Sequence, residues 1–264
     1  MILASVPPAS MVLGLAAALA YALPAALAGR IAASAGRAVL VIAWLLHGAL
    51  LARGLLGPAP LFGFAPALSI TAWLVLTVYG VESRLYPRMQ ARWTLSGLGA
   101  VAVLLSLVFP GTPLHVEESP WLPLHLALGI ASYGLFAAAL VHTWLMTRAE
   151  RQMRRAAEPQ SGMPLLTLER LTFRFVTAGF VLLTATLAAG LLFGEVLYGR
   201  AWRWDHKAVF SVLSWATFLV LLLGRMRFGW RGRTALRWLY AGSALLLLAY
   251  VGSRFVLEVV LGRP

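Results

Sequence analysis

The sequence predicts an all-α, polytopic integral membrane protein with eight transmembrane helices and a short outer interfacial helix. Of its 264 residues, 61% are hydrophobic and only 12% are charged, and the mean hydropathy is +0.82. Soluble domains contain about 45–50% apolar and about 25% charged residues, so this composition excludes a water-soluble globule. The apolar residues are also grouped into eight long stretches, with short basic connectors between them.

Each stretch approaches the roughly 20 apolar residues that a helix needs to cross the hydrocarbon layer, where only internal hydrogen bonds satisfy the backbone. Because the connectors are short, we expect one eight-span transmembrane domain over residues 1–264, with no second, soluble domain. The predicted spans are 9–28, 37–56, 64–81, 93–110, 121–146, 172–194, 206–224 and 236–260.

Flanking residues refine three of these elements. No Lys or Arg precedes the first span, so we expect an uncleaved helix and not a signal peptide. The fifth span is expected to continue as a helix beyond residue 146, because Glu150 and Arg154 are spaced for a pair on one helix face, and to break at Pro159. The interfacial helix is expected over residues 198–205, where Trp and Arg alternate.

The distribution of basic residues fixes the direction of the spans, since cytoplasmic loops of membrane proteins are rich in Lys and Arg. Sixteen of the 22 basic residues fall on one side of the predicted membrane, which places both termini outside. The net charge of +13 therefore indicates lipid headgroups, and no nucleic acid, as the partner. The sixteen are Arg30, Arg37, Arg84, Arg88, Arg92, Arg148, Arg151, Arg154, Arg155, Arg170, Arg174, Arg225, Arg227, Arg231, Arg233 and Arg237.

Motifs for hydrolysis and phosphoryl transfer are missing from the sequence. It has no Gly-rich loop ending in Lys-Ser/Thr, no His-Glu-x-x-His and no Gly-x-Ser-x-Gly, so we expect no enzymatic activity. It also contains no cysteine, which excludes thiolate metal sites and covalent c-type haem attachment to this chain. Any cofactor is therefore held non-covalently.

Three histidines are candidates for a ligand site, because an ionisable side chain in or beside a span usually faces a partner or a cavity. His125 lies one turn inside the outer end of the fifth span, His47 near the middle of the second, and His206 at the start of the seventh. Neutral imidazole is a common axial ligand of haem iron. The alternative for each is a structural or solvated histidine, and that alternative is preferred for His142 and His115.

The segment before the seventh span contains Trp202 and Trp204, and the last span contains Arg254 in its outer third. The tryptophans suit either an aromatic belt at headgroup depth or an apolar platform for a flat tetrapyrrole. Arginine suits the propionate carboxylates of such a ligand, whereas snorkelling to the surface is its alternative role. We take Trp202, Trp204 and Arg254 as candidate cofactor-binding residues.

These residues, in this order, resemble the cytochrome c assembly protein family of membrane haem-handling proteins, and most closely its HemX-like, YpjD-type branch. The resemblance extends over most of the chain. It is carried by His125 with Ser132-Tyr133, by residues 202–207 running into 211–215, by Gly229-Trp230-Arg231-Gly232-Arg233, and by Ala249-Tyr250-Val-Gly252-Ser-Arg254.

The resemblance implies that the protein handles haem, with His125 as the first ligand to the haem iron. Either His206 or His47 then supplies the second ligand, or the haem is five-coordinate. Because the chain has no cysteine, such a haem is of b-type and held non-covalently. The resemblance further implies a multi-pass protein of the bacterial inner membrane that assists haem handling in cytochrome c biogenesis, with other cytochrome c maturation proteins or another membrane protein as partners. The alternative is a haem-free accessory or regulatory membrane subunit, which acts through partner proteins on tetrapyrrole synthesis or ion transport.

The sixteen-to-six split of basic residues predicts which connectors a reagent outside the membrane reaches. A single cysteine replacing Ser119 should react with a membrane-impermeant maleimide in intact spheroplasts, because its connector lies outside, and a cysteine replacing Ser161 should be protected. The chain has no cysteine of its own, so there is no background labelling. Labelling at residue 161 but not at residue 119 would overturn the orientation.

Overall fold

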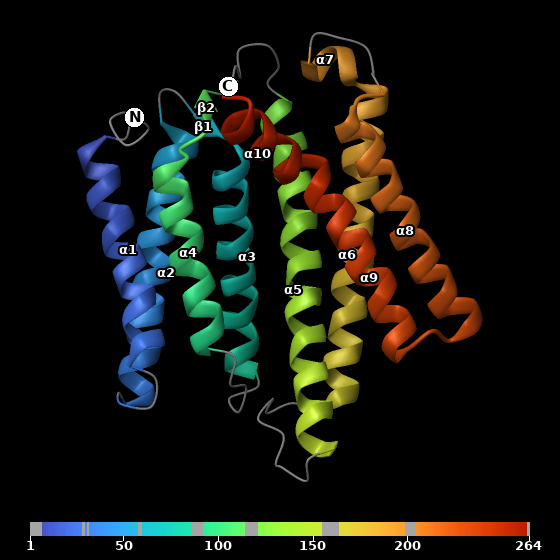
Figure 1. Ribbon diagram of the computed structural model, residues 1–264, viewed down its shortest axis with the longest axis horizontal. Coiled ribbons are helices and arrows are strands. Elements are labelled where there is room, and N and C mark those ends of the chain that lie inside the picture. The colour runs from blue at the N-terminus through green and yellow to red at the C-terminus, as the bar shows by residue number, and fades with distance from the viewer. Residues whose placement is uncertain are drawn as a thin grey trace. The chain divides into compact units, whose positions relative to one another are not determined.

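The computed structural model describes residues 7–27, 30, 32–57, 60–85, 92–113, 121–154, 164–198 and 204–262. Contacts between helices divide the chain into two compact units (Figure 1). Unit 1 comprises Met1–Leu114, Arg151–Met163 and Pro264, and unit 2 comprises His115–Glu150 and Pro164–Arg263. All eight predicted spans fall on helices.

Unit 1 is built from four helices: α1 (Pro8–Ala26), α2 (Ala33–Leu56), α3 (Phe64–Leu85) and α4 (Arg92–Val108). Two-residue strands, β1 (Leu61–Phe62) and β2 (Thr112–Pro113), pair antiparallel beside them. Gly111 permits this pairing, because its φ is +83° and a Cβ atom there would lie 2.6 Å from the backbone of Phe62. The core between the helices contains Ala17, Tyr21, Ala43 and Val103.

Unit 2 contains α5 (Leu122–Arg154), α6 (Leu165–Leu192), α7 (Gly194–Tyr198), α8 (His206–Phe228) and α9 (Gly232–Leu247). The chain continues from α9 without a break through the π-helical segment η3 (Leu248–Gly252), the short α10 (Ser253–Phe255) and a second π-helical segment, η4 (Val256–Val260). As expected, α5 extends past residue 146, to Arg154.

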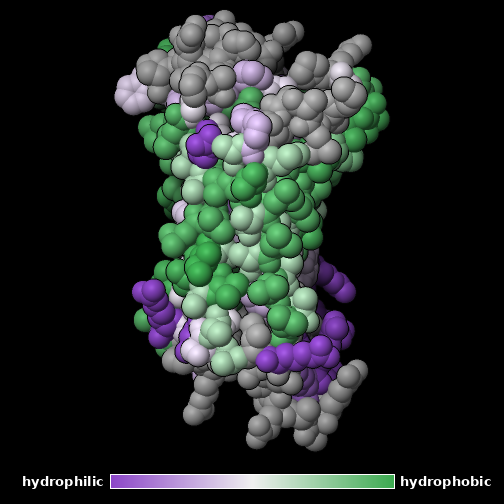
Figure 2. Space-filling model, turned by 90° about the vertical axis from the view of Figure 1, so that its left-hand side faces the viewer, coloured by the Kyte–Doolittle hydropathy of each residue, from purple (hydrophilic) through white to green (hydrophobic). Residues whose placement is uncertain are grey.

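Six helices of the described residues are long and apolar enough to cross a membrane: Ser34–Leu56, Phe64–Leu85, Leu122–Arg154, Leu165–Leu192, His206–Phe228 and Gly232–Val260. The apolar parts of α1 and α4 are shorter, at Pro8–Pro24 and Leu95–Val108. Figure 2 shows one face of the protein, on which hydrophobic residues cover the middle of the helices and hydrophilic residues gather towards the ends. The polytopic membrane architecture predicted from the sequence is confirmed.

The short interfacial helix predicted before α8 is tested only at its two ends. The described helix α7 covers Gly194–Tyr198, whereas the prediction was 198–205, of which residues 199–203 lie outside the described part. Trp204 and Asp205 are not helical, because Asp205 is the N-cap of α8. Its Oδ1 accepts a hydrogen bond from the backbone N–H of Ala208 at 2.9 Å.

Two stacked phenylalanines form the centre of unit 2. The rings of Phe136 on α5 and Phe218 on α8 are almost parallel, at 4°, with 3.8 Å between their centroids. Gly179 on α6 lies against the ring of Phe136, and Gly242 on α9 lies against that of Phe218. Four helices therefore meet at this stack, with glycines allowing α6 and α9 to approach closely.

The stack predicts that unit 2 does not tolerate a methyl group at Gly242. A Cβ atom there would lie 2.9 Å from the Phe218 ring, and this ring cannot withdraw because it is fully buried against Phe136. Gly242→Ala should lower the free energy of unfolding by about 1–3 kcal/mol, measured by thermal unfolding in mild detergent. Gly129→Ala is the matched control, because its Cβ atom would lie 3.6 Å from Thr186. Equal stability of the two variants would contradict the prediction.

Candidate functional site

Four of the predicted site residues lie at one end of unit 2. The helices of this unit alternate in direction, so α5 and α8 begin at the end where the last helix, η4, finishes (Figure 1). His125 is in the first turn of α5, Trp204 and His206 are at the start of α8, and Arg254 is in α10. We call this the His125 end of unit 2, and the opposite one, where α8 finishes and α9 begins, the Arg225 end.

His125 is placed where the sequence predicted it. Its backbone N–H donates to the carbonyl oxygen of Trp121 at 3.0 Å, and this bond fixes the residue in the opening turn of α5. The side chain is half-buried. Trp121 directly precedes the helix and is 60% exposed, as is typical of an indole at the membrane interface.

His206 and Trp204 present their side chains at the surface. Trp204 is 70% exposed, and His206, the first residue of α8, is also exposed. Asp205, which lies between them, caps α8 and so fixes the start of the helix at His206. The imidazole of His206 and the indole of Trp204 are therefore accessible to a ligand.

Arg254 is an arginine whose hydrogen-bonding capacity is not used within the described residues. The side chain is half-buried, and its Nε atom is buried without a hydrogen-bond partner in the described part of the chain. A buried donor without an acceptor costs free energy. A carboxylate oxygen is the acceptor that would satisfy a guanidinium best.

A contact that the sequence did not predict brings two segments of unit 2 together. The hydroxyl of Tyr133 on α5 donates a hydrogen bond to the carbonyl oxygen of Leu246, just before the helix changes from α to π geometry at Leu248. Ser253 stabilises the widened turn, since its hydroxyl donates to the carbonyls of Ala249 and Tyr250 at 3.0 Å. Arg254 follows directly, so Tyr133 and the π-helical turn together determine its position.

His47 belongs to unit 1, where it is fully buried. Its Nε2 lies 2.8 Å from the hydroxyl of Ser69 on α3. Its Nδ1 lies 3.4 Å from the hydroxyl of Tyr21 on α1. Both imidazole nitrogens thus face hydroxyl groups, and His47 could bind a metal ion only if one of these contacts broke.

The remaining candidates differ in their surroundings. His142 is buried in unit 2, with its ring 5.2 Å from that of Phe175, so its surroundings fit the structural role preferred for it. His115 and Trp202 lie outside the described residues. Within the described part, no three His, Cys, Asp or Glu side chains are grouped closely enough to hold a metal ion. The donors at the His125 end are single imidazoles, which suit an iron already held by a porphyrin.

Comparison with known proteins identifies the family of this chain. The model of the family "Cytochrome C assembly protein" matches residues 8–261. The chain belongs to the cytochrome c assembly protein family. This match covers both units, and it includes His125, His206 and Arg254 as well as His47.

Several relatives show how far the similarity extends. The inner membrane protein YpjD of Escherichia coli K12 is 34% identical over 148 residues, which is 55% of this chain and 56% of YpjD. The chain thus matches only just over half the length of that relative. An uncharacterised 28.8 kDa protein of Azospirillum brasilense is 32% identical over 214 residues, 76% of this chain and 77% of that protein.

A further relative has a named function. The cytochrome c biogenesis protein CcsA of Synechococcus sp. CC9902 is 26% identical over 231 residues, which cover 74% of this chain and 75% of CcsA. No solved structure matches the chain significantly.

Proposed function

We propose that this cytochrome c assembly family member binds a b-type haem non-covalently at the His125 end of unit 2 and assists haem handling in cytochrome c biogenesis. The observation that carries the proposal is the placement of two imidazoles, an exposed indole and a guanidinium at that one end. The family match and the similarity to CcsA support it.

The chemistry of these side chains fits haem. Imidazole nitrogen is the common axial ligand of haem iron, and His125 and His206 each supply one. Trp204, 70% exposed, offers an apolar face for the porphyrin. The buried Nε of Arg254 offers a donor for a propionate. When bound, haem would supply an iron atom for coordination, while the residues of this chain hold it in place.

We assign the second axial position to His206 in preference to His47. His206 is exposed and lies in the same unit as His125. His47 lies in unit 1, and its nitrogens already face the hydroxyl groups of Ser69 and Tyr21. Ligation by His206 leaves that buried network intact.

We further propose eight spans in the bacterial inner membrane, with both termini periplasmic. At 1.5 Å per residue, the 19 residues of α1 and the 17 residues of α4 extend about 28 and 26 Å, close to the roughly 30 Å of the hydrocarbon core. The Arg225 end then faces the cytoplasm. The connectors that carry Ser119 and Ser161 lie outside the described residues.

No bond-making chemistry is part of the proposal. The protein acts by holding haem and not as an enzyme, and its partners are the bilayer and other cytochrome c maturation proteins. The inner membrane location follows that of YpjD, and the role in biogenesis follows the name of CcsA.

Replacing His125 tests the proposal directly. If His125 and His206 both ligate, the iron is low-spin, and His125→Ala should either remove haem or convert it to a high-spin form, because one axial ligand is lost. The measurements are the Soret band and the spin state of protein purified in mild detergent. His206→Ala should have the same effect and His47→Ala should not.

His142→Gln is the matched control on the same helix. His142 lies 17 residues from His125, or roughly 25 Å along α5 at 1.5 Å per residue, towards the other end of the helix. Its replacement should leave the haem spectrum unchanged. An unchanged Soret band and spin state in well-folded His125→Ala protein would reject the assignment. Wild-type protein that is haem-free after purification from haem-replete cells would favour the accessory subunit instead.

A further inference from the structure

Residues 225–237 lie at the Arg225 end of unit 2 and comprise the last turn of α8, the connection to α9 and the start of α9. We call this segment the α8–α9 turn. It carries both exposed apolar and exposed basic side chains. Met226 is 79% exposed and Phe228 is 76% exposed. Four arginines of the same turn are exposed as well: Arg227, Arg231, Arg233 and Arg237. Large apolar side chains and guanidinium groups are thus both exposed where α8 ends and α9 begins.

The conformation of this turn is fixed by its own packing. Gly229 and Gly232 have positive φ angles of 64° and 54°, which favour glycine. The indole of Trp230 lies so close to Gly224 that a Cβ atom there would be 2.3 Å from it, and it stacks on Trp238 with 5.7 Å between ring centroids. The arginines are therefore presented by an ordered turn.

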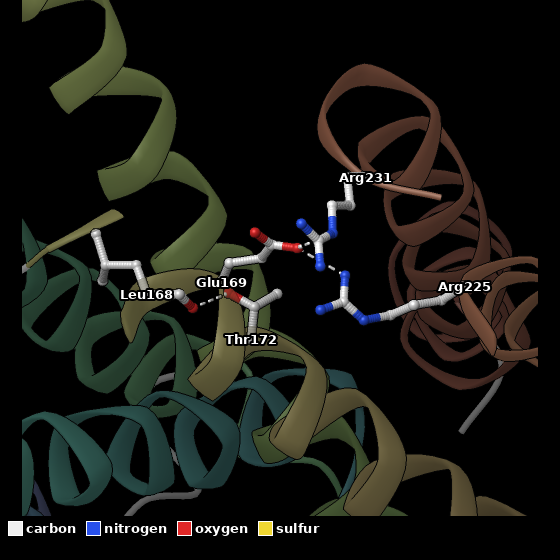
Figure 3. A network of polar contacts seen from close by, with 5 residues as sticks. All are labelled: Leu168, Glu169, Thr172, Arg225 and Arg231. Atoms are coloured by element: carbon white, nitrogen blue, oxygen red, sulfur yellow. Dashed lines mark hydrogen bonds and ion pairs between the residues drawn. The ribbon is translucent and has the colours of Figure 1, made fainter. Parts of the chain in front are cut away.

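One arginine of the turn is committed to a structural contact. Figure 3 shows Glu169 of α6 facing Arg225 and Arg231. Its Oε1 lies 2.7 Å from Nη1 of Arg225 and 3.6 Å from Nε of Arg231. Arg225 also places its guanidinium carbon 3.5 Å from the ring centroid of Phe173. This contact ties α8 to α6.

The other arginines leave positive charge uncompensated. Arg231 meets Glu169 only at the longer distance and its side chain is 69% exposed. Within the described part of the chain, Arg227, Arg233 and Arg237 form no ion pair. Among the described residues, the carboxylate of Glu169 is the one that pairs with arginines of this segment. Most of the guanidinium donors are therefore available to an anionic group from outside the chain.

We propose that the α8–α9 turn binds the headgroup of an anionic phospholipid. Guanidinium groups match phosphate oxygens in a two-pronged geometry, and basic clusters at the ends of transmembrane helices attract anionic lipids. Met226 and Phe228 lie at the end of a membrane-spanning helix, where they contact acyl chains while the arginines contact the phosphate. An anionic phospholipid thus offers a phosphate to the arginines and acyl chains to the two apolar side chains. This lipid site is independent of the proposed haem site.

Binding is tested on the full-length protein in mild detergent. We expect cardiolipin and phosphatidylglycerol, but not phosphatidylcholine, to raise the unfolding temperature and to remain attached in native mass spectrometry. The triple variant Arg227→Gln, Arg231→Gln, Arg233→Gln should bind cardiolipin at least about tenfold more weakly, because three phosphate donors are lost. All three side chains are exposed, so the variant should fold.

Two further variants test whether cardiolipin binding depends on the arginines and on the apolar side chains of the α8–α9 turn. Arg30→Gln, Arg37→Gln, Arg84→Gln removes the same charge from exposed positions of unit 1 and should bind cardiolipin as the wild type does. Met226→Gln, Phe228→Gln keeps every arginine and should weaken cardiolipin binding, because the acyl-chain contact is lost. An equal loss of cardiolipin binding in both triple variants would overturn the proposed site. An equal stabilisation by inorganic phosphate, or no effect of cardiolipin on the wild type, would also overturn it.

Discussion

The stack of Phe136 on Phe218 is the contact on which unit 2 depends. Lipid provides no hydrophobic driving force between helices, so transmembrane helices associate through close packing and hydrogen bonds. Here the two rings lie 3.8 Å apart, and glycines at 179 and 242 bring the neighbouring helices against them. A further hydrogen bond, from the hydroxyl of Ser214 to the carbonyl of Gly242 at 2.9 Å, holds α8 to α9 at the same level. The positions of both ends of unit 2 follow from this centre.

The two units treat their polar groups differently. In unit 1, His47 contacts Ser69 and Tyr21, and the indole of Trp44 donates to Thr77 at 2.8 Å. Because an unpaired polar group is costly in a membrane, this network stabilises the interior of unit 1. Unit 2 instead has, at its His125 end, an exposed His206 and a buried Arg254 Nε atom that has no hydrogen-bond partner among the described residues. That contrast is why we propose the haem site in unit 2.

The helices were predictable from the sequence because the length of an apolar run nearly determines a membrane helix. The position of His125 in the first turn of α5 was predictable for the same reason, since its distance from the start of the apolar run fixes its turn. The last two residues of the predicted interfacial helix, Trp204 and Asp205, are not helical because Asp205 caps α8, and the Trp-Arg alternation gave no sign of this cap. The hydrogen bond from Tyr133 to Leu246 joins residues 113 positions apart. The pairing of Glu169 with Arg225 depends on packing in the same way, so no local pattern could reveal either contact.

The central claim is that the His125 end holds haem without a covalent bond. The most direct measurement is the haem content of wild-type protein purified in mild detergent from haem-replete cells, before and after extraction with acidified acetone. The account predicts about one b-type haem per chain, which the extraction removes completely because the chain has no cysteine to retain it. Protein that carries no haem, although it is folded and its cells make haem normally, would contradict the claim.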